Sequence, residues 1–148
     1  MEIITLPERT VLAQTHTLTL ALAEVGLRSA TTCPALEQLA RQLGLTIDGP
    51  WQFVAEGLPE RADHPFTLRI CLPVQGEHPA LTRLPACRCA RRLYQGPLNA
   101  LFEQGYSPLL AAIRAEGRPL IGESREVYHH WAGPDSPDNR IEIQFVLA

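Results

Sequence analysis

The chain has 148 residues, of which 45% are hydrophobic and 20% charged, and its formal net charge is −3. That length suffices for one domain or for two small halves that share a core. The slightly acidic balance disfavours nucleic acid and anionic membranes as main partners. No apolar run is long enough to cross a bilayer, and the start MEIITLPERT does not have the pattern of a secretory signal. The sequence therefore predicts a cytoplasmic protein.

The cysteines and histidines do not have the spacing of a metal or redox site. Cys87 and Cys89 are two positions apart, not in the Cys-x-x-Cys arrangement. His129 and His130 are adjacent, so they point to opposite faces of a strand. We therefore expect free thiols, no metal and no cofactor. The sequence also lacks a nucleophile elbow, a phosphate loop and a dinucleotide fingerprint.

The first half of the chain predicts a strand followed by a helix. Residues 9–17 have the pattern of a strand, and residues 18–31 are ambiguous between a helical turn and a structured connection. Pro34 suits the first position of a helix, apolar residues then recur at helical spacing, and Gly44 ends it. Two strands are expected over residues 51–56 and 66–74, with a turn-rich loop over residues 57–65 between them.

The second half has the same order of elements. A strand over residues 85–94 is followed by a helical turn that Gly105 interrupts. The Ser107-Pro108 pair provides an N-cap and first turn for a second helix, which Gly117 ends. Two strands are expected over residues 126–131 and 141–147, with a turn-rich loop over residues 133–139 between them.

These parallels indicate an internal repeat. A shift of 73 positions takes Gly44 to Gly117 and Val54 to Val127. The same shift takes the alternating apolar residues of the strand at 66–74 to those of the final strand. Each half therefore has the order strand, helix, strand, strand.

The repeat predicts an α+β fold in which residues 1–148 form a single domain. Each half, approximately residues 1–76 and 77–148, has one helix over one small sheet and buries little apolar surface alone. We expect a tandem βαββ repeat with pseudo-two-fold symmetry, an antiparallel sheet, the helices on one face and a central ligand cleft. Concave seams of this kind are favoured ligand sites.

Alternation of side chains along the strands divides the remaining residues between two faces. If the helices cover the apolar face that carries Ile70 and Ile143, aromatic and charged residues occupy the other face. We assign to that face Trp51, Phe53, Arg69, Glu126, Tyr128, Glu142 and Gln144. Aromatic rings beside a carboxylate are suited to an organic cation, since the ring quadrupole and the negative charge both attract it.

Several short blocks occur in the order and spacing of a known family. They are Gly49-Pro50-Trp51-x-Phe53, Leu84-Pro85, Gly122-x3-Glu126-Val127-Tyr128 and Ile141-Glu142-Ile143. Over nearly the whole chain they resemble the GyrI-like small-molecule-binding domain, which is also the effector-binding domain of AraC- and MerR-type multidrug regulators. The resemblance implies a tandem αβ fold with a central cleft. It also implies that Glu142 faces the ligand and that Glu126 and Tyr128 form the family's E-x-Y strand.

Three functions are open at this point. The favoured one is a stand-alone domain that sequesters or senses hydrophobic, cationic small molecules, with ligand contacts from Glu142, Tyr128, Glu126, Trp51, Phe53, Gln144 and Arg69. An enzyme is less favoured: a cofactor-free hydrolase of strained, cyclopropane-bearing toxins that uses Glu142, Glu126 and Tyr128. A third is a gyrase-inhibitor-like interaction protein. We expect a monomer or homodimer with no direct contact to nucleic acid or membrane.

Each candidate residue also has a purely structural explanation. Glu142 would then be a solvated strand residue, and Glu126 would form an ion pair with Arg69. Trp51, Phe53 and Tyr128 would belong to the edge of the core. The basic cluster of Arg88, Arg91 and Arg92 favours a solvated strand face over a site for an acidic partner.

Overall fold

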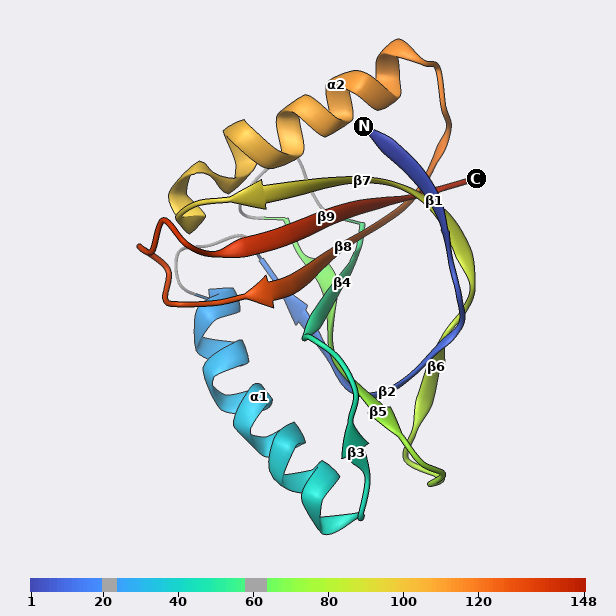
Figure 1. Cartoon of the computed structure of the whole chain (residues 1–148), viewed down its shortest axis with the longest axis vertical. Coiled ribbons are helices and arrows are strands. Elements are labelled where there is room, and N and C mark those ends of the chain that lie inside the picture. Colours follow the sequence, from blue (N-terminus) through green and yellow to red (C-terminus); the bar gives the residue numbers. More distant parts are fainter. Residues whose placement is uncertain (20–23, 58–63) are drawn as a thin grey trace. The chain divides into compact units, whose positions relative to one another are not determined.

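The computed structural model describes residues 1–19, 24–57 and 64–148 (Figure 1). The ambiguous stretch at 18–31 and the expected loop at 57–65 lie partly outside these described residues. The chain divides into two compact units, one of Glu8–Pro85 and the other of Met1–Pro7 together with Ala86–Ala148. Neither helix in the described ranges is long and apolar enough to cross a membrane.

The unit Glu8–Pro85 is an antiparallel sheet with one helix on it. Its elements are β2 (Arg9–Leu18), α1 (Glu24–Gln42), β3 (Thr46–Ile47), β4 (Gln52–Glu56), β5 (Phe66–Gln75) and β6 (Thr82–Leu84). The strand order is β4-β5-β2-β6, and the short strand β3 pairs with the end of β5. The three strands predicted in this half are confirmed, whereas β3 and β6 were not predicted.

Helix α1 begins at Glu24 and holds Pro34 in its interior. The prediction that Pro34 opens this helix is therefore wrong. An interior proline removes one backbone hydrogen bond and disfavours a helix locally. Packing of the buried residues Thr32, Leu36 and Ala40 against the sheet overrides that local preference, as tertiary contacts commonly do.

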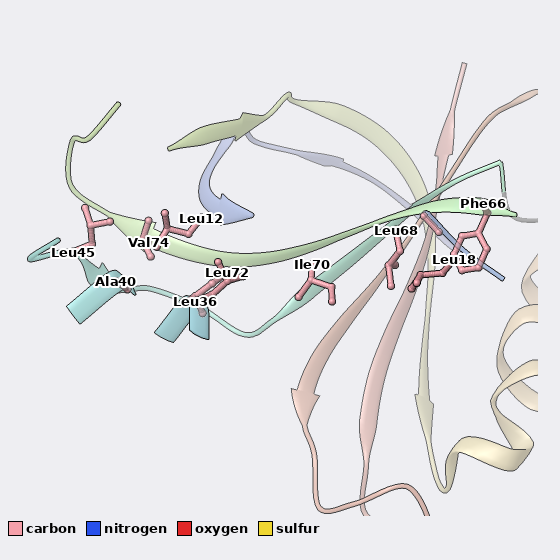
Figure 2. Packing of buried hydrophobic residues seen from close by; sticks show 11 residues of the cluster. Leu12, Leu18, Leu36, Ala40, Leu45, Phe66, Leu68, Ile70, Leu72 and Val74 are labelled. Atoms are coloured by element: carbon pink, nitrogen blue, oxygen red, sulfur yellow. The ribbon is translucent and has the colours of Figure 1, made fainter. Parts of the chain in front are cut away.

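The core of this unit lies between α1 and one face of its sheet (Figure 2). Leu36 and Ala40 of the helix pack against apolar side chains of β2 and β5. The buried strand residues are Leu12, Leu18, Phe66, Leu68, Ile70, Leu72 and Val74. The members from β5 alternate along the strand, which confirms the predicted apolar face.

The other unit has the same plan, with four strands against the five described in the first unit. Its elements are β1 (Glu2–Leu6), β7 (Cys87–Gln95), the 3-10 turn η1 (Leu98–Ala100), the π-helical turn η2 (Phe102–Tyr106), α2 (Ser107–Ala115), β8 (Leu120–His130) and β9 (Arg140–Leu147). The antiparallel strand order is β1-β7-β9-β8, and α2 runs beside β7 (Figure 1). The strands predicted in this half are confirmed, and β1 was not predicted.

The chain enters α2 through the π-helical turn. Tyr106 has helical backbone angles, φ −66° and ψ −50°, and leads directly into Ser107. The predictions that Gly105 interrupts the helix and that Ser107 caps a new one are therefore wrong. Gly105 instead permits a close approach, because a Cβ atom there would overlap Cδ1 of Ile143 in β9.

The two helix ends confirm the predicted repeat. Gly44 and Gly117 have positive φ values of 70° and 65°. After each glycine, the next backbone N–H bonds to a carbonyl oxygen five residues earlier, in the pattern of a Schellman motif. The two bonds are Leu45 N to Ala40 O at 2.9 Å and Arg118 N to Ile113 O at 3.2 Å. The repeat therefore extends to the backbone geometry of equivalent positions.

Candidate functional site

The strand registers divide the predicted site residues between the two faces of the sheets. In the β8–β9 pair, Glu126 lies opposite Ile143 and Val127 lies opposite Glu142. Directly opposed residues in antiparallel strands share a face. Glu126 is therefore on the face covered by α2, and Glu142 is on the other face. The prediction that the two glutamates share one face is wrong. The register between β8 and β9 decides which residues of the two strands lie on the same face, and the sequence alone does not give that register.

The same correction applies to the unit Glu8–Pro85. Phe53 lies opposite Ile70, so Phe53 and Trp51 face α1 and pack against the core of that unit. Arg69 points to the opposite face and forms an ion pair with Glu56 at 3.3 Å. That Trp51, Phe53 and Arg69 contact a ligand stays a prediction.

On the α2 face, the carboxylate of Glu126 lies between two tyrosine hydroxyls. Tyr128 donates a hydrogen bond to Oε1 at 2.6 Å, and Tyr106 donates one to Oε2. Tyr128 follows Glu126 by two positions on β8 and so shares its face. Tyr106 comes from η2 and is only 7% exposed. Glu126 and Tyr128 were predicted to lie together, as they do, but Tyr106 was not predicted.

Aromatic rings extend outward from both tyrosines. Phe102 stacks on Tyr106 with a centroid distance of 6.2 Å, and Trp131 meets Tyr128 edge to face at 5.7 Å. Phe102 is 63% exposed and Trp131 is 47% exposed, so both outer rings are open to solvent. We name this group the aromatic–carboxylate cluster; it consists of Phe102, Tyr106, Glu126, Tyr128 and Trp131.

Tyr106 is held in its protonated form. Burial raises the pKa of its hydroxyl well above the usual value of 10, and the adjacent Glu126 carboxylate raises that pKa further. The hydroxyl therefore keeps its proton and donates a hydrogen bond to the Glu126 carboxylate at any physiological pH. The two donors that fix the Glu126 carboxylate are neutral hydroxyls, so neither brings a positive charge to it.

We expect the free energy of unfolding of the Tyr106→Phe variant to fall less steeply with rising pH above pH 10 than that of wild type. Above pH 10 the unfolded state releases the tyrosine proton while the folded state keeps it, so the free energy of unfolding falls as pH rises, by up to about 1.4 kcal/mol per pH unit. Phenylalanine has no such proton. Urea unfolding of both proteins between about pH 8 and pH 11 measures the difference.

Other titrating groups cancel in this comparison. Burial raises the pKa of Cys33 and of Cys89 to about 11, but both thiols are present in wild type and variant. Parallel pH curves for the two proteins would contradict the protonated, buried state of Tyr106.

On the face opposite α2, the carboxylate of Glu142 is fully engaged. His129 Nε2 lies 3.1 Å from Oε1, and Gln144 Nε2 donates to Oε2 at 2.6 Å. Arg91 lies 3.8 Å from Oε2, and the Glu142 side chain is only 13% exposed. The Glu142 carboxylate is therefore already paired within the protein. Gln144 is 3% exposed and orients Glu142.

An open depression of about 790 Å³ lies beside Glu142, within the unit that contains β7, β8 and β9. Its lining residues are Met1, Glu2, Arg91, Arg92, Leu93, His129, Arg140 and Glu142. Strand β1 pairs with β7 over Cys87–Arg91, so Arg92 and Leu93 extend beyond the paired stretch. We name this feature the Glu142 depression.

Comparison with known proteins identifies the fold. No family model and no curated protein matches the chain. The C-terminal domain of EcmrR matches 99% of this chain and 96% of its own length, with a TM-score of 0.79 and 20% identity. Against the longer EcmrR chain in a complex with DNA, this chain spans 56% of the length, with 19% identity and a TM-score of 0.79.

Two further solved structures have the same fold. SAV2435 bound to tetraphenylphosphonium matches 99% of this chain and 93% of its own, with a TM-score of 0.67 and 11% identity. A hydrolase encoded by lin2189 from Listeria innocua matches 99% and 91%, with a TM-score of 0.59 and 13% identity. The chain thus has the α+β fold of these domains, which confirms the predicted GyrI-like resemblance at the level of the fold.

Proposed function

We propose that this protein binds hydrophobic organic cations at the aromatic–carboxylate cluster, as a sequestering or sensing domain. The observation that carries the proposal is the position of the Glu126 carboxylate between the Tyr106 and Tyr128 hydroxyls, whose rings in turn contact the exposed rings of Phe102 and Trp131. A cation near these rings is attracted by their quadrupoles and by the carboxylate charge. SAV2435, which has the same fold, was solved with tetraphenylphosphonium, an aromatic cation.

Charge favours Glu126 over Glu142 as the anion that receives the cation. The groups that hold Glu126 are neutral hydroxyls, so its charge is available to a ligand. Glu142 already contacts Arg91 and His129, and a cation would have to compete with them. The two tyrosines also fix the Glu126 carboxylate before a ligand arrives, which lowers the entropic cost of binding.

The same register argues against the hydrolase alternative. That mechanism needs Glu126 and Glu142 in one cleft, where one carboxylate activates water while the other holds a proton. The pairing of Val127 with Glu142 places the two carboxylates on opposite faces of the sheet. The gyrase-inhibitor-like alternative stays a prediction.

We expect the Glu126→Gln variant to bind tetraphenylphosphonium roughly 5- to 150-fold more weakly than wild type. This equals a loss of about 1–3 kcal/mol, the scale of a charge-assisted contact. Isothermal titration calorimetry measures the change. Triphenylphosphine oxide, a neutral analogue, should lose much less affinity, because it does not use the carboxylate charge.

Glu103→Gln is the matched control for this experiment. Glu103 is an exposed residue of the same π-helical turn and loses the same charge on substitution. We expect its affinity for tetraphenylphosphonium to equal that of wild type. Equal affinities in wild type and Glu126→Gln would refute the proposed cation site.

We also propose that the protein works in the cytoplasm. The cysteines form no disulfide within the described residues, and Cys71 and Cys89 are fully buried. Free thiols suit a reducing compartment.

A further inference from the structure

We propose that the Glu142 depression is a second ligand site, which binds a small organic carboxylate. Most of its lining, including Arg140 and Glu142, is on the sheet face opposite the aromatic–carboxylate cluster. Arg92 lies opposite Ile143 and is therefore on the α2 face, but the two sites share no side chain. The proposal rests on the charges and contacts of the lining residues, and it does not depend on cation binding at Glu126.

Two of the three arginines in the lining are free to meet an anion. Arg91 is already committed, since its guanidinium lies 2.5 Å from Glu2 and 3.8 Å from Glu142. Arg92 is exposed and donates its Nε–H to the carbonyl oxygen of Gln104 at 3.3 Å. Arg140 is exposed and has no ion pair with any residue in the described ranges.

Glu142 cannot readily neutralise Arg140, although the two residues share a face of β9. Both carboxylate oxygens of Glu142 are occupied, one by His129 and the other by Gln144. The hydrogen bonds hold the Glu142 side chain against the sheet, where it is 13% exposed. The positive charge of Arg140 therefore remains available to a ligand in the depression.

The charge balance of the lining favours a monoanion. Counted over side chains alone and with histidine neutral, three arginines and two glutamates leave one uncompensated positive charge. A dianion would meet repulsion from Glu2 and Glu142, whereas a carboxylate matches both the net charge and the planar fork of a guanidinium. Leu93 is 57% exposed in the same lining and offers apolar contact to the hydrocarbon part of such a ligand.

The test compares naphthoate with naphthamide, which have the same ring system but differ in charge. By titration calorimetry, wild type should bind naphthoate about tenfold or more tightly than naphthamide, as expected for one charge-assisted contact. Arg140→Gln and Arg92→Gln should each weaken naphthoate binding about tenfold. Arg88→Gln, an exposed arginine of β7 outside the lining, should leave the affinity unchanged.

Each remaining outcome supports or overturns the proposal. Equal binding of naphthoate and naphthamide by wild type overturns it without reference to any variant. Undiminished naphthoate binding in the Arg92→Gln, Arg140→Gln double variant also overturns it, as does loss of that binding in Glu126→Gln. Retention of tetraphenylphosphonium binding in Arg140→Gln, with naphthoate binding lost, supports two separate sites. Failure of cation binding at Glu126 leaves the naphthoate result unaffected.

Discussion

Replacing Glu123 by alanine should lower the free energy of unfolding by about 3 kcal/mol or more, the cost of leaving a buried charge without its partner. Arg125 is 4% exposed, and its Nε and a terminal nitrogen both lie 2.8 Å from one carboxylate oxygen of Glu123. Without that oxygen the guanidinium stays buried, since Arg125 lies directly opposite the buried Gln144 of β9, on the same face of the sheet. Urea unfolding measures the loss.

The chain contains a matched control for this ion pair. Glu116 and Arg118 have the same two-residue spacing and bond through the same atoms at 2.7 Å, but their side chains are 49% and 38% exposed. Glu116→Ala should therefore cost about 1 kcal/mol or less. The double variant Glu123→Ala, Arg125→Met should recover most of the lost stability, because the buried charge is gone. Equal losses in the free energy of unfolding for Glu123→Ala and Glu116→Ala would show that burial of Arg125 does not raise the loss.

Ile143→Ala should destabilise the protein by about 2–5 kcal/mol, the range for truncating a fully buried aliphatic side chain. Ile143 is 0% exposed, lies opposite Glu126 in the sheet and touches the π-helical turn at Gly105. The cavity would loosen the support of Tyr106. We therefore expect weaker tetraphenylphosphonium binding together with the lower stability.

A double-mutant cycle isolates the contact between Ile143 and Gly105. In Gly105→Ala the new Cβ atom overlaps Cδ1 of Ile143, and Ile143→Val removes that methyl group. Each single variant should be destabilised, and the double variant should be more stable than the sum of the two effects predicts. Strict additivity would mean that the turn does not rest on Ile143.

The repeat and the helix ends could be predicted from the sequence because they depend on local chemistry. Gly44 and Gly117 take a left-handed conformation that other residues adopt at a cost, so a glycine at equal spacing in both halves is informative. Alternation of apolar residues along β5 and β9 likewise predicted their buried faces. These features need no knowledge of which strands pair, or in which register.

The composition of the site could not be predicted in the same way. Alternation orders the residues within one strand, but the register decides which face of β8 matches which face of β9, and this separated Glu126 from Glu142. Tyr106 was missed because the π-helical turn was expected to break at Gly105. One signal was present: Phe102 and Tyr106 are four positions apart, the spacing at which aromatic residues stack on a helix.

Strand β1 has a consequence for how the polypeptide is threaded. Residues Met1–Pro7 belong to the unit formed by Ala86–Ala148, so the chain passes between the units twice, after Pro7 and after Pro85. The contact of Glu2 with Arg91 joins positions 89 apart in sequence. Closing such a long loop is slow, so we expect the pairing of β1 with β7 to be a late step in folding. Cleavage at either crossing leaves the units covalently tied through the other.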